Sequence, residues 1–289
     1  MHVSALFLYP VKSLRGFAVS AARVDALGMV GDRRFLVIDG EGTMLTQRVA
    51  PQMARITTEL TATDLLLRAQ AGAPLAVPLA ATDAPLRTVA VWRSHGLLAE
   101  DCGPEASDWL SSQLGLKAHL VRIGSAFRRP VLDRPAFAPG GASGSLIEGR
   151  LASASDVFHF ADGFPFMATT QSSLALLNDR LAESGAAPVP MDRFRPSFVI
   201  SGSAPFAEDG WSRLRVGELS FRNGGPSARC IVTTTDQLSG ERMGAEPLRT
   251  LATFRRDPDD STRINFGQNL VHETKSGTLR VGDPVEVLS

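Results

Sequence analysis

Short apolar runs bounded by turn residues restrict the fold of this chain more than any other feature of its sequence. The run at residues 3–9 stops at Pro10, and the run at residues 34–38 stops at the turn formed by residues 39–42. Apolar runs of this length between Pro, Gly and Asp residues predict β-strands. Similar runs follow at residues 56–60, 64–68 and 88–92. Strands this short at such spacing favour a barrel or a sandwich.

Two segments have helical periodicity. Residues 105–114 carry apolar side chains at helical spacing and end at Gly115, which suits a helix C-cap. Residues 170–181 place Leu174, Leu177 and Leu181 on one helical face. Strands are expected again at residues 197–201, 213–216, 219–222, 230–235 and 278–288. The fold class that this order predicts is mixed α/β and mainly β.

Charge and composition exclude several classes of partner. The 289 residues include 30 basic and 30 acidic residues, so no global field attracts nucleic acid or an anionic membrane. Residues 1–16 lack the pattern of a signal peptide, and no run approaches the roughly 18 apolar residues of a membrane span. The two cysteines, Cys102 and Cys230, form neither a disulfide framework nor a CxxC site. We therefore expect a cytoplasmic protein with reduced thiols, without nucleic acid or a membrane span.

Cys230 is the main candidate for chemistry, although spacing alone leaves two interpretations open. It stands in the segment PSARCIVTTT at residues 226–235, between a Gly-Gly-Pro turn and a β-branched run. The neighbouring Arg229 favours the thiolate, the form of cysteine that binds metals or attacks electrophiles. A free cysteine is also often a small buried apolar residue, which is the alternative interpretation.

Several basic residues follow turns at the ends of predicted strands. Lys12 and Ser13 follow the residues YPV at 9–11, Arg33 follows a Gly-Asp turn, and Arg195 precedes a proline. Cationic side chains beside backbone N–H groups that a turn exposes suit an anion such as phosphate. The alternative for each is a solvated surface charge or a structural ion pair.

Other kinds of chemistry lack their sequence patterns. Spacing brings no two acidic residues together for hydrolysis, and there is no GxSxG elbow. The histidines have no HxxxH spacing, and the Gly-rich stretches match neither the phosphate loop nor the dinucleotide fingerprint. A Ser/His/Asp arrangement stays open. The residues by themselves indicate an anion-binding, thiol-bearing, β-rich protein.

Several motifs resemble those of MOSC-domain proteins (molybdenum-cofactor sulfurase C-terminal), which include the amidoxime-reducing components and their bacterial counterparts. The N-terminal motifs are YPVKSLRG at 9–16, GDRRFLVI at 31–38 and LTQR at 45–48. The C-terminal motifs are FRP at 194–196, AEDGW at 207–211, ARC at 228–230, FGQN at 266–269 and VGDPV at 281–285. The resemblance implies a MOSC N-terminal β-barrel-like domain at residues 1–125 and a β-rich MOSC domain at 151–289. Residues 126–150 are predicted to be a linker or a loop beside a site, because residues 127–149 are rich in Pro and Gly.

The resemblance also implies a cofactor site. In that family a cysteine thiolate binds molybdenum together with the two dithiolene sulfurs of a pyranopterin, and the matching position is Cys230. Soft molybdenum suits a thiolate, and phosphate suits basic side chains and a helix N-terminus. Ala228 stands where a serine is expected, which leaves only its backbone for this contact. The positions that match cofactor contacts are Lys12, Ser13, Arg33, Thr170, Gln171, Arg195, Ser227, Ala228, Arg229 and Asn269.

The implied activity is molybdenum-dependent reduction of N-hydroxylated compounds, namely amidoximes, hydroxylamines and N-hydroxylated bases. Electrons are expected from a separate electron-transfer protein or reductase, because the chain has no cysteine cluster for a fused iron–sulfur domain. Asp192 or Asp236 is a candidate proton relay, and Cys102 is expected to be structural or incidental. One alternative is a carrier or sulfur-delivery module that binds the cofactor, or a persulfide on Cys230, without turnover. Another is a β-rich binding protein in which Cys230 is buried and the resemblance is accidental.

Overall fold

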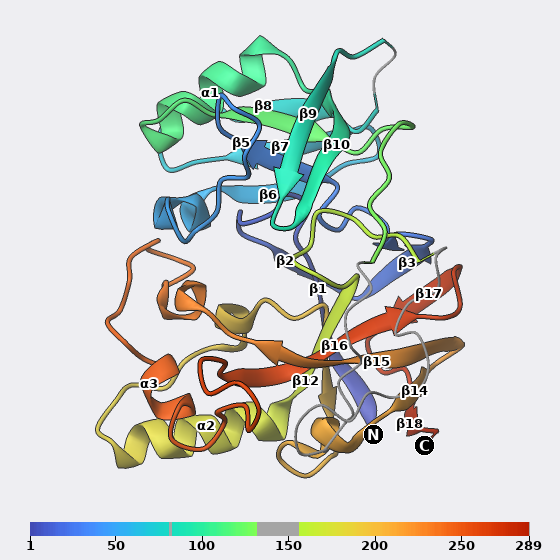
Figure 1. Cartoon of the computed structure of the whole chain (residues 1–289), viewed down its shortest axis with the longest axis vertical. Coiled ribbons are helices and arrows are strands. Elements are labelled where there is room, and N and C mark those ends of the chain that lie inside the picture. The colour runs from blue at the N-terminus through green and yellow to red at the C-terminus, as the bar shows by residue number, and fades with distance from the viewer. Residues whose placement is uncertain (81–82, 132–155, 289) are drawn as a thin grey trace.

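Figure 1 shows the computed structural model, in which residues 1–80, 83–131 and 156–288 are described. Two lobes built largely of strands lie one above the other in this view. The lower lobe contains an eight-stranded sheet, and the upper lobe contains a four-stranded and a three-stranded sheet. The prediction of a mixed, mainly β fold is confirmed.

The eight-stranded sheet is the frame of the lower lobe. Its order is β18–β14–β15–β16–β12–β13–β1–β2, and its neighbours are antiparallel except for the parallel pair β12 and β13. Buried side chains such as Leu6, Phe166 and Phe221 form its core. The strands are β1 (His2–Leu8), β2 (Phe17–Val19), β12 (Phe166–Thr170), β13 (Phe198–Ser201), β14 (Arg213–Val216), β15 (Leu219–Ala228), β16 (Asn265–His272) and β18 (Val285–Val287).

Two helices of the lower lobe, α2 (Gln171–Glu183) and α3 (Leu248–Leu251), share a second core that includes Leu177, Leu251 and Phe266. Three short 3-10 helices complete this lobe. They are η2 (Met191–Phe194), η3 (Ala207–Gly210) and η4 (Ile231–Thr234).

The upper lobe combines two small sheets with one helix. The first sheet has the order β5–β11–β10–β9 and the second β6–β7–β8. Leu67, Leu110 and Leu120 join the helix to the strands in one buried core. The elements are β5 (Phe35–Ile38), η1 (Pro51–Arg55), β6 (Thr57–Leu60), β7 (Asp64–Arg68), β8 (Leu75–Pro78), β9 (Leu86–Val91), β10 (Ser94–Asp101), α1 (Pro104–Leu114) and β11 (His119–Arg122).

The first strands of the chain belong to the lower lobe. β1 pairs with β13, and β3 (Ala21–Asp25) lies between β4 (Gly28–Met29) and β17 (Gly277–Arg280) in a small sheet. The loop after β1 then meets the upper lobe, where the Lys12 N–H donates to the Phe35 carbonyl at 3.0 Å. This loop therefore lies where the two lobes meet.

Both predicted long helices are confirmed, and their ends follow from local chemistry. α1 has Pro104 in its first turn and ends at Gly115, whose φ of 68° is the left-handed conformation that glycine adopts without strain. α2 starts after Thr170, whose Oγ1 accepts the Ser173 N–H at 3.1 Å.

The predicted strand at residues 230–235 is wrong, because this segment forms η4. The Thr233 hydroxyl donates to the Cys230 carbonyl at 2.9 Å, and the Thr234 hydroxyl donates to the Ile231 carbonyl at 2.8 Å. Threonine side chains that bond to nearby carbonyls offer the backbone an alternative to a sheet ladder. The β-branched run therefore turns instead of extending.

Residues 132–150 of the predicted linker lie outside the described residues. The residues just before them pack against residues 158–160. The centroids of the Phe127 and Phe160 rings lie 4.8 Å apart in an edge-to-face arrangement, and the Phe158 N–H donates to the Arg129 carbonyl at 3.0 Å.

Across the described part of the chain, no helix has both the length and the apolar character needed to cross a membrane.

Candidate functional site

A cavity of about 830 Å³ is lined by residues of both lobes. Its wall includes the loop after β1, the β9–β10 turn, residues 161–165 and the end of β15. Most of the predicted site residues meet there, and we therefore take this cavity as the candidate site. The predicted residues that line it are Lys12, Ser13, Arg33, Arg195, Ser227, Ala228, Arg229, Cys230 and Asn269.

Cys230 follows an irregular end of β15. The register between β15 and β16 shifts twice, between Asn223 and Pro226 and again between Pro226 and Ala228. Bulges of this kind redirect side chains beside functional sites. The thiol is free and half-buried, and the Thr233 N–H donates to the Cys230 carbonyl at 3.0 Å. The backbone that carries the thiol is thus fixed by the turn after it.

Arg229 joins the end of β15 to the neighbouring turn. Its Nη1 donates to Ser227 Oγ at 2.8 Å, and its Nη2 donates to the Phe194 carbonyl at 2.6 Å. On β16, Asn269 Nδ2 donates to the Pro226 carbonyl at 3.1 Å. Burial lowers the pKa of Arg229, but a guanidinium stays protonated in proteins. This wall therefore presents a fixed cation beside the thiol.

Lys12 and Asp162 form an ion pair across the cavity. Lys12 is 6% exposed, and Asp162 Oδ1 also accepts the Trp92 indole N–H at 2.9 Å. Burial lowers the pKa of Lys12, and the Asp162 carboxylate acts against this shift. Among the described residues that line the cavity, Asp162 is the one carboxylate, whereas seven are lysine or arginine.

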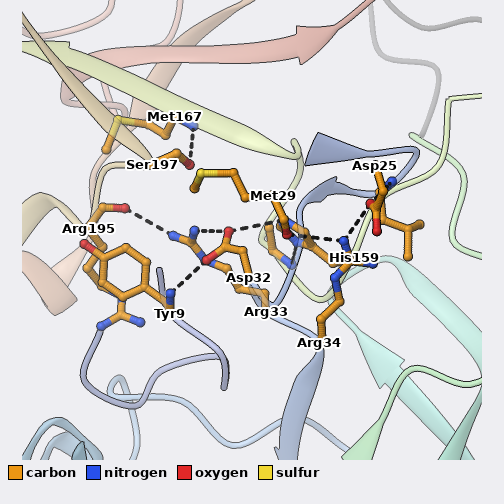
Figure 2. A network of polar contacts seen from close by, with 12 residues as sticks. Tyr9, Asp25, Met29, Asp32, Arg33, Arg34, His159, Met167, Arg195 and Ser197 are labelled. Atoms are coloured by element: carbon orange, nitrogen blue, oxygen red, sulfur yellow. Dashed lines mark hydrogen bonds and ion pairs between the residues drawn. The ribbon is translucent and has the colours of Figure 1, made fainter. Parts of the chain in front are cut away.

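Figure 2 shows Arg33 and Arg195 beside the ring of Tyr9. Both guanidinium carbons lie 4.3 Å from the ring centroid, and Arg33 Nη2 donates to the Arg195 carbonyl at 3.2 Å. The electron-rich ring face attracts both cations, which repel each other. Burial lowers the pKa of Arg195 to about 10, so the side chain remains charged at neutral pH. Two oriented cations therefore belong to the cavity wall.

Asp32 orients Arg33 from the protein interior (Figure 2). It is fully buried, accepts the Tyr9 N–H at 2.8 Å and forms an ion pair with Arg33. Burial opposes its charge, but Arg33 holds the pKa of Asp32 below its usual value. His159 Nε2 lies 3.4 Å from the same carboxylate, and burial lowers the pKa of His159 to about 4. His159 is therefore neutral at physiological pH.

Residues with a strained backbone conformation are concentrated around this cavity. Six described non-glycine residues have a φ between 45° and 69°, and Ser13, Arg33, Trp92 and Arg195 among them line the cavity. The left-handed region costs such residues of order 1–3 kcal/mol each, so contacts around them must hold them. Gln47 Nε2, for example, donates to the Ser13 carbonyl at 2.8 Å. Strain of this kind concentrates at functional sites.

Thr170 and Gln171 do not line the cavity. β12 contributes its other end, Phe166 and Met167, to the wall. Thr170 caps α2 instead, and Gln171 Oε1 accepts the Ser201 hydroxyl. Thr170 thus starts the helix, and Gln171 links its first turn to β13.

The two candidate proton relays and the second cysteine also lie away from the cavity wall. Asp236 pairs with Arg193 at 3.0 Å, and burial raises the pKa of Asp192. Cys102 packs against the upper-lobe core, where burial raises the pKa of its thiol to about 12. Cys102 therefore stays protonated at neutral pH.

Sequence reasoning missed Asp162, Trp92 and Arg48, which line the cavity. Asp162 is 150 residues from Lys12 and 70 residues from Trp92, so no local spacing connects them. The Arg48 guanidinium carbon lies 4.4 Å from the Trp92 ring centroid. The LTQR motif marked the segment of Arg48, but no sequence signal marked Asp162.

The residues that line the cavity fit an anionic cofactor that itself supplies further ligands to a bound metal. The cavity is lined by the thiol of Cys230 and by cationic groups of Lys12, Arg33, Arg195 and Arg229. No group of three His, Cys, Asp or Glu that could hold a metal ion occurs within the described ranges. A metal at Cys230 would therefore take further ligands from a cofactor, and the cations suit an anionic one.

Known proteins resemble the chain along nearly its whole length. Residues 1–117 match the family described as the MOSC N-terminal beta barrel domain, and residues 155–286 match the MOSC domain. Human mitochondrial amidoxime-reducing component 1 is 34% identical over 300 residues, covering 99% of this chain and 82% of the relative. The molybdenum cofactor sulfurase of Oryza sativa subsp. japonica is 30% identical, covering 94% of this chain and 33% of the relative.

A solved structure, the YUAD protein from Bacillus subtilis, aligns with a TM-score of 0.37 at 9% identity, covering 98% of this chain and 92% of that one. This similarity is too low to support any inference. The two family matches and the human relative, however, agree with the family that the sequence motifs indicated. The chain belongs to the MOSC-domain family that includes the mitochondrial amidoxime-reducing components.

Proposed function

We propose that this chain binds a molybdenum–pyranopterin cofactor through Cys230 and reduces N-hydroxylated compounds such as amidoximes, hydroxylamines and N-hydroxylated bases. The observation that carries the proposal is a single cavity in which the Cys230 thiol lies among Lys12, Arg33, Arg195 and Arg229. The identity of 34% with human mitochondrial amidoxime-reducing component 1 supports the reaction class. The volume of about 830 Å³ lies within the range of small-molecule sites.

When bound, the cofactor would supply the two-electron redox chemistry that reduction of an N–O bond requires. The residues of the chain hold this group and balance its charge. Cys230 Sγ would hold the cofactor as a ligand and would not act as a nucleophile. Lys12 Nζ and the guanidiniums of Arg195 and Arg229 offset the negative charge of the cofactor. Arg33 is already oriented by Asp32, so its donors need little ordering when an anion binds.

The substrate would enter past Trp92 and Arg48. Trp92 is 37% exposed, and the Arg48 guanidinium packs on its ring at 4.4 Å. A flat aromatic and cationic rim suits planar, conjugated groups such as an amidoxime. Phe164 and Met167 line the same cavity and exclude water from part of its wall.

A separate electron-transfer protein delivers the electrons in this proposal. The 289 residues contain two cysteines, too few for a cluster held by four thiolates. Both cysteines are free, and Cys230 is assigned to molybdenum.

The test is the molybdenum content of protein made with added molybdate in a host that synthesises the cofactor. We expect near-stoichiometric metal in the wild type and in Cys102→Ser, the matched control for the other free thiol. Cys230→Ser should lose the metal, and its benzamidoxime reduction with an artificial electron donor should fall by more than roughly 100-fold. That exceeds the usual effect of residues that merely support a metal ligand. A fully loaded and active Cys230→Ser would overturn the proposal.

The similarity to a rice molybdenum cofactor sulfurase favours a second candidate, a carrier that binds the cofactor or a Cys230 persulfide without turnover. The same experiment separates the two candidates. A carrier loses its molybdenum in Cys230→Ser but shows no benzamidoxime reduction in the wild type with the artificial donor.

A further inference from the structure

Arg129 stands just outside the cavity and holds two segments that form its wall. Its side chain is 2% exposed, so the guanidinium lies in the protein interior. Nη1 donates to the His159 carbonyl at 2.9 Å and to the Ala161 carbonyl, and Nη2 donates to the Asp162 carbonyl at 3.3 Å. One side chain therefore fixes three carbonyls of the short segment that carries Asp162.

The same guanidinium also reaches the upper lobe. Arg129 Nε donates to Ser94 Oγ at 3.1 Å. Ser94 begins β10, directly after Trp92 and Arg93, and both of these line the cavity. The planar guanidinium can bond in several fixed directions at once, which a lysine ammonium cannot reproduce. Arg129 thus joins the turn that carries Trp92 to the segment that carries Asp162.

These two segments meet in the cavity through side chains. The Trp92 indole N–H donates to Asp162 Oδ1 at 2.9 Å, and Asp162 also forms the ion pair with Lys12. Arg129 and Lys12 are both cations, so a direct interaction between them is repulsive. Burial and this repulsion both lower the pKa of Lys12, so any help that Arg129 gives in placing Lys12 must come through the segments that it holds.

We propose that Arg129 is a positioning residue that holds Asp162 and Trp92 together and thereby directs the Lys12 ammonium into the cavity. The kinetic part of this proposal rests on the proposed function, because it concerns a residue that would contact the cofactor. The geometric part concerns only this chain and can be tested without activity.

Arg122 provides a matched control for a buried arginine with a purely structural role. It is 3% exposed, and it donates to Glu100 at 2.8 Å and to the Pro78 carbonyl at 2.7 Å in the upper lobe. Neither Arg122 nor these partners line the cavity. Replacing Arg122 should destabilise the fold without changing the contact between Trp92 and Asp162.

The experiment records indole N–H signals in two-dimensional NMR spectra of ¹⁵N-labelled protein. The chain has three tryptophans, and Trp92→Phe identifies the signal of Trp92. We expect Arg129→Met and Asp162→Ala to shift the Trp92 signal in the same direction and speed its exchange with solvent. Trp109, which donates to the Ala73 carbonyl at 2.8 Å, and Trp211 should keep their signals. Arg122→Met should leave all three indole N–H signals unshifted.

Arg129→Lys and Ser94→Ala are milder variants on which the same measurement can be made if Arg129→Met does not fold. Each retains part of the hydrogen-bond network, so each should give a smaller shift of the Trp92 signal than Asp162→Ala. A folded Arg129→Met or Arg129→Lys with an unshifted Trp92 signal would overturn the proposal, whatever the activity of the wild type.

The kinetic readout applies once wild-type benzamidoxime reduction is established. Residues that orient a contact of a metal site typically change activity by about 10–100-fold. We expect kcat/KM to fall roughly 10-fold in Arg129→Met, with no further loss when Asp162→Ala is added, because both changes remove one arrangement. Independent, multiplying effects of the two substitutions would contradict a shared role.

Discussion

At the scale of single residues, Tyr9 stabilises the cavity wall through its aromatic ring. The ring lies 4.3 Å from the guanidinium carbons of both Arg33 and Arg195, while its hydroxyl is buried without a hydrogen-bond partner among the described residues. Burial raises the pKa of this hydroxyl to about 12, so it is uncharged. The contribution of Tyr9 should therefore come from the ring and not from the hydroxyl.

Tyr9→Phe keeps the ring and removes the buried hydroxyl. We expect its free energy of unfolding, from urea titration at pH 7, to be unchanged or raised by up to about 1 kcal/mol, because an unpaired buried polar group is removed. Tyr9→Leu removes the cation–π contacts and should lose about 2 kcal/mol or more. A loss above about 1 kcal/mol in Tyr9→Phe would show that the hydroxyl is hydrogen-bonded in solution, for example to water.

The sequence revealed some residues of the site and missed others. Turn chemistry and the resemblance to MOSC proteins brought out Lys12, Ser13 and Cys230, which the structure places around one cavity. Asp162 escaped notice because its partners lie 150 and 70 residues away. A side chain whose role depends on contacts between lobes leaves no trace in local spacing.

At the scale of elements, Thr170 caps the start of α2 and lies outside the cavity wall. Thr170 Oγ1 accepts the Ser173 N–H at 3.1 Å, and the Ser173 hydroxyl lies 2.8 Å from the buried Glu208 carboxylate. Burial raises the pKa of Glu208, so this carboxylate depends on its hydroxyl donors. Thr170 therefore supports the helix and a buried polar cluster.

Thr170→Ala should lower the free energy of unfolding by about 1–2 kcal/mol, the usual effect of losing a threonine N-cap. Thr170→Ser retains the capping oxygen and serves as the control, with a smaller loss. Because Thr170 does not line the cavity, molybdenum content should stay at the wild-type level in both. A stable Thr170→Ala that lost its metal would instead place this residue in contact with the cofactor.

Element boundaries followed from sequence where one local pattern was decisive. Short runs bounded by turn residues gave β7 and β14 with the bounds that the structure shows. The pattern failed at residues 231–234, where threonine hydroxyls bond to the local backbone and form η4. It also gave no strand order, so the pairing of β1 with β13 was not predictable.

At the scale of the whole molecule, the two lobes meet through buried, oriented hydrogen bonds. The amides of Gln47 and Gln237, 190 residues apart, donate to each other at 3.1 and 3.0 Å. Arg15 Nε adds a bond to the Gln237 carbonyl at 2.7 Å. Gln47 also donates to the Ser13 carbonyl. The hydrogen bonds between the lobes and those that hold the cavity wall therefore form one network.

Two buried histidines tie the stability of the whole fold to pH. His159 and His272 are both fully buried, and burial lowers the pKa of each from an ordinary value near 6.5 to about 4. The folded state therefore keeps both rings neutral between these values, while the unfolded chain takes up protons. Because the unfolded state binds more protons in this window, stability falls as the pH falls from about 6.5 towards 4.

The free energy of unfolding should therefore drop by a few kcal/mol between pH 7 and pH 4.5, at about 1.4 kcal/mol per pH unit for each histidine at most. Urea titrations across this range give the slope. His159→Gln replaces one titrating ring by a neutral amide beside Asp32, so the slope should fall to about half of the wild-type value, with His272 supplying the remainder. His95→Gln, at an exposed position, should leave the slope unchanged. An unchanged slope in His159→Gln would mean that His159 is already protonated in the folded protein, with Asp32 as its partner, and that burial does not control its charge.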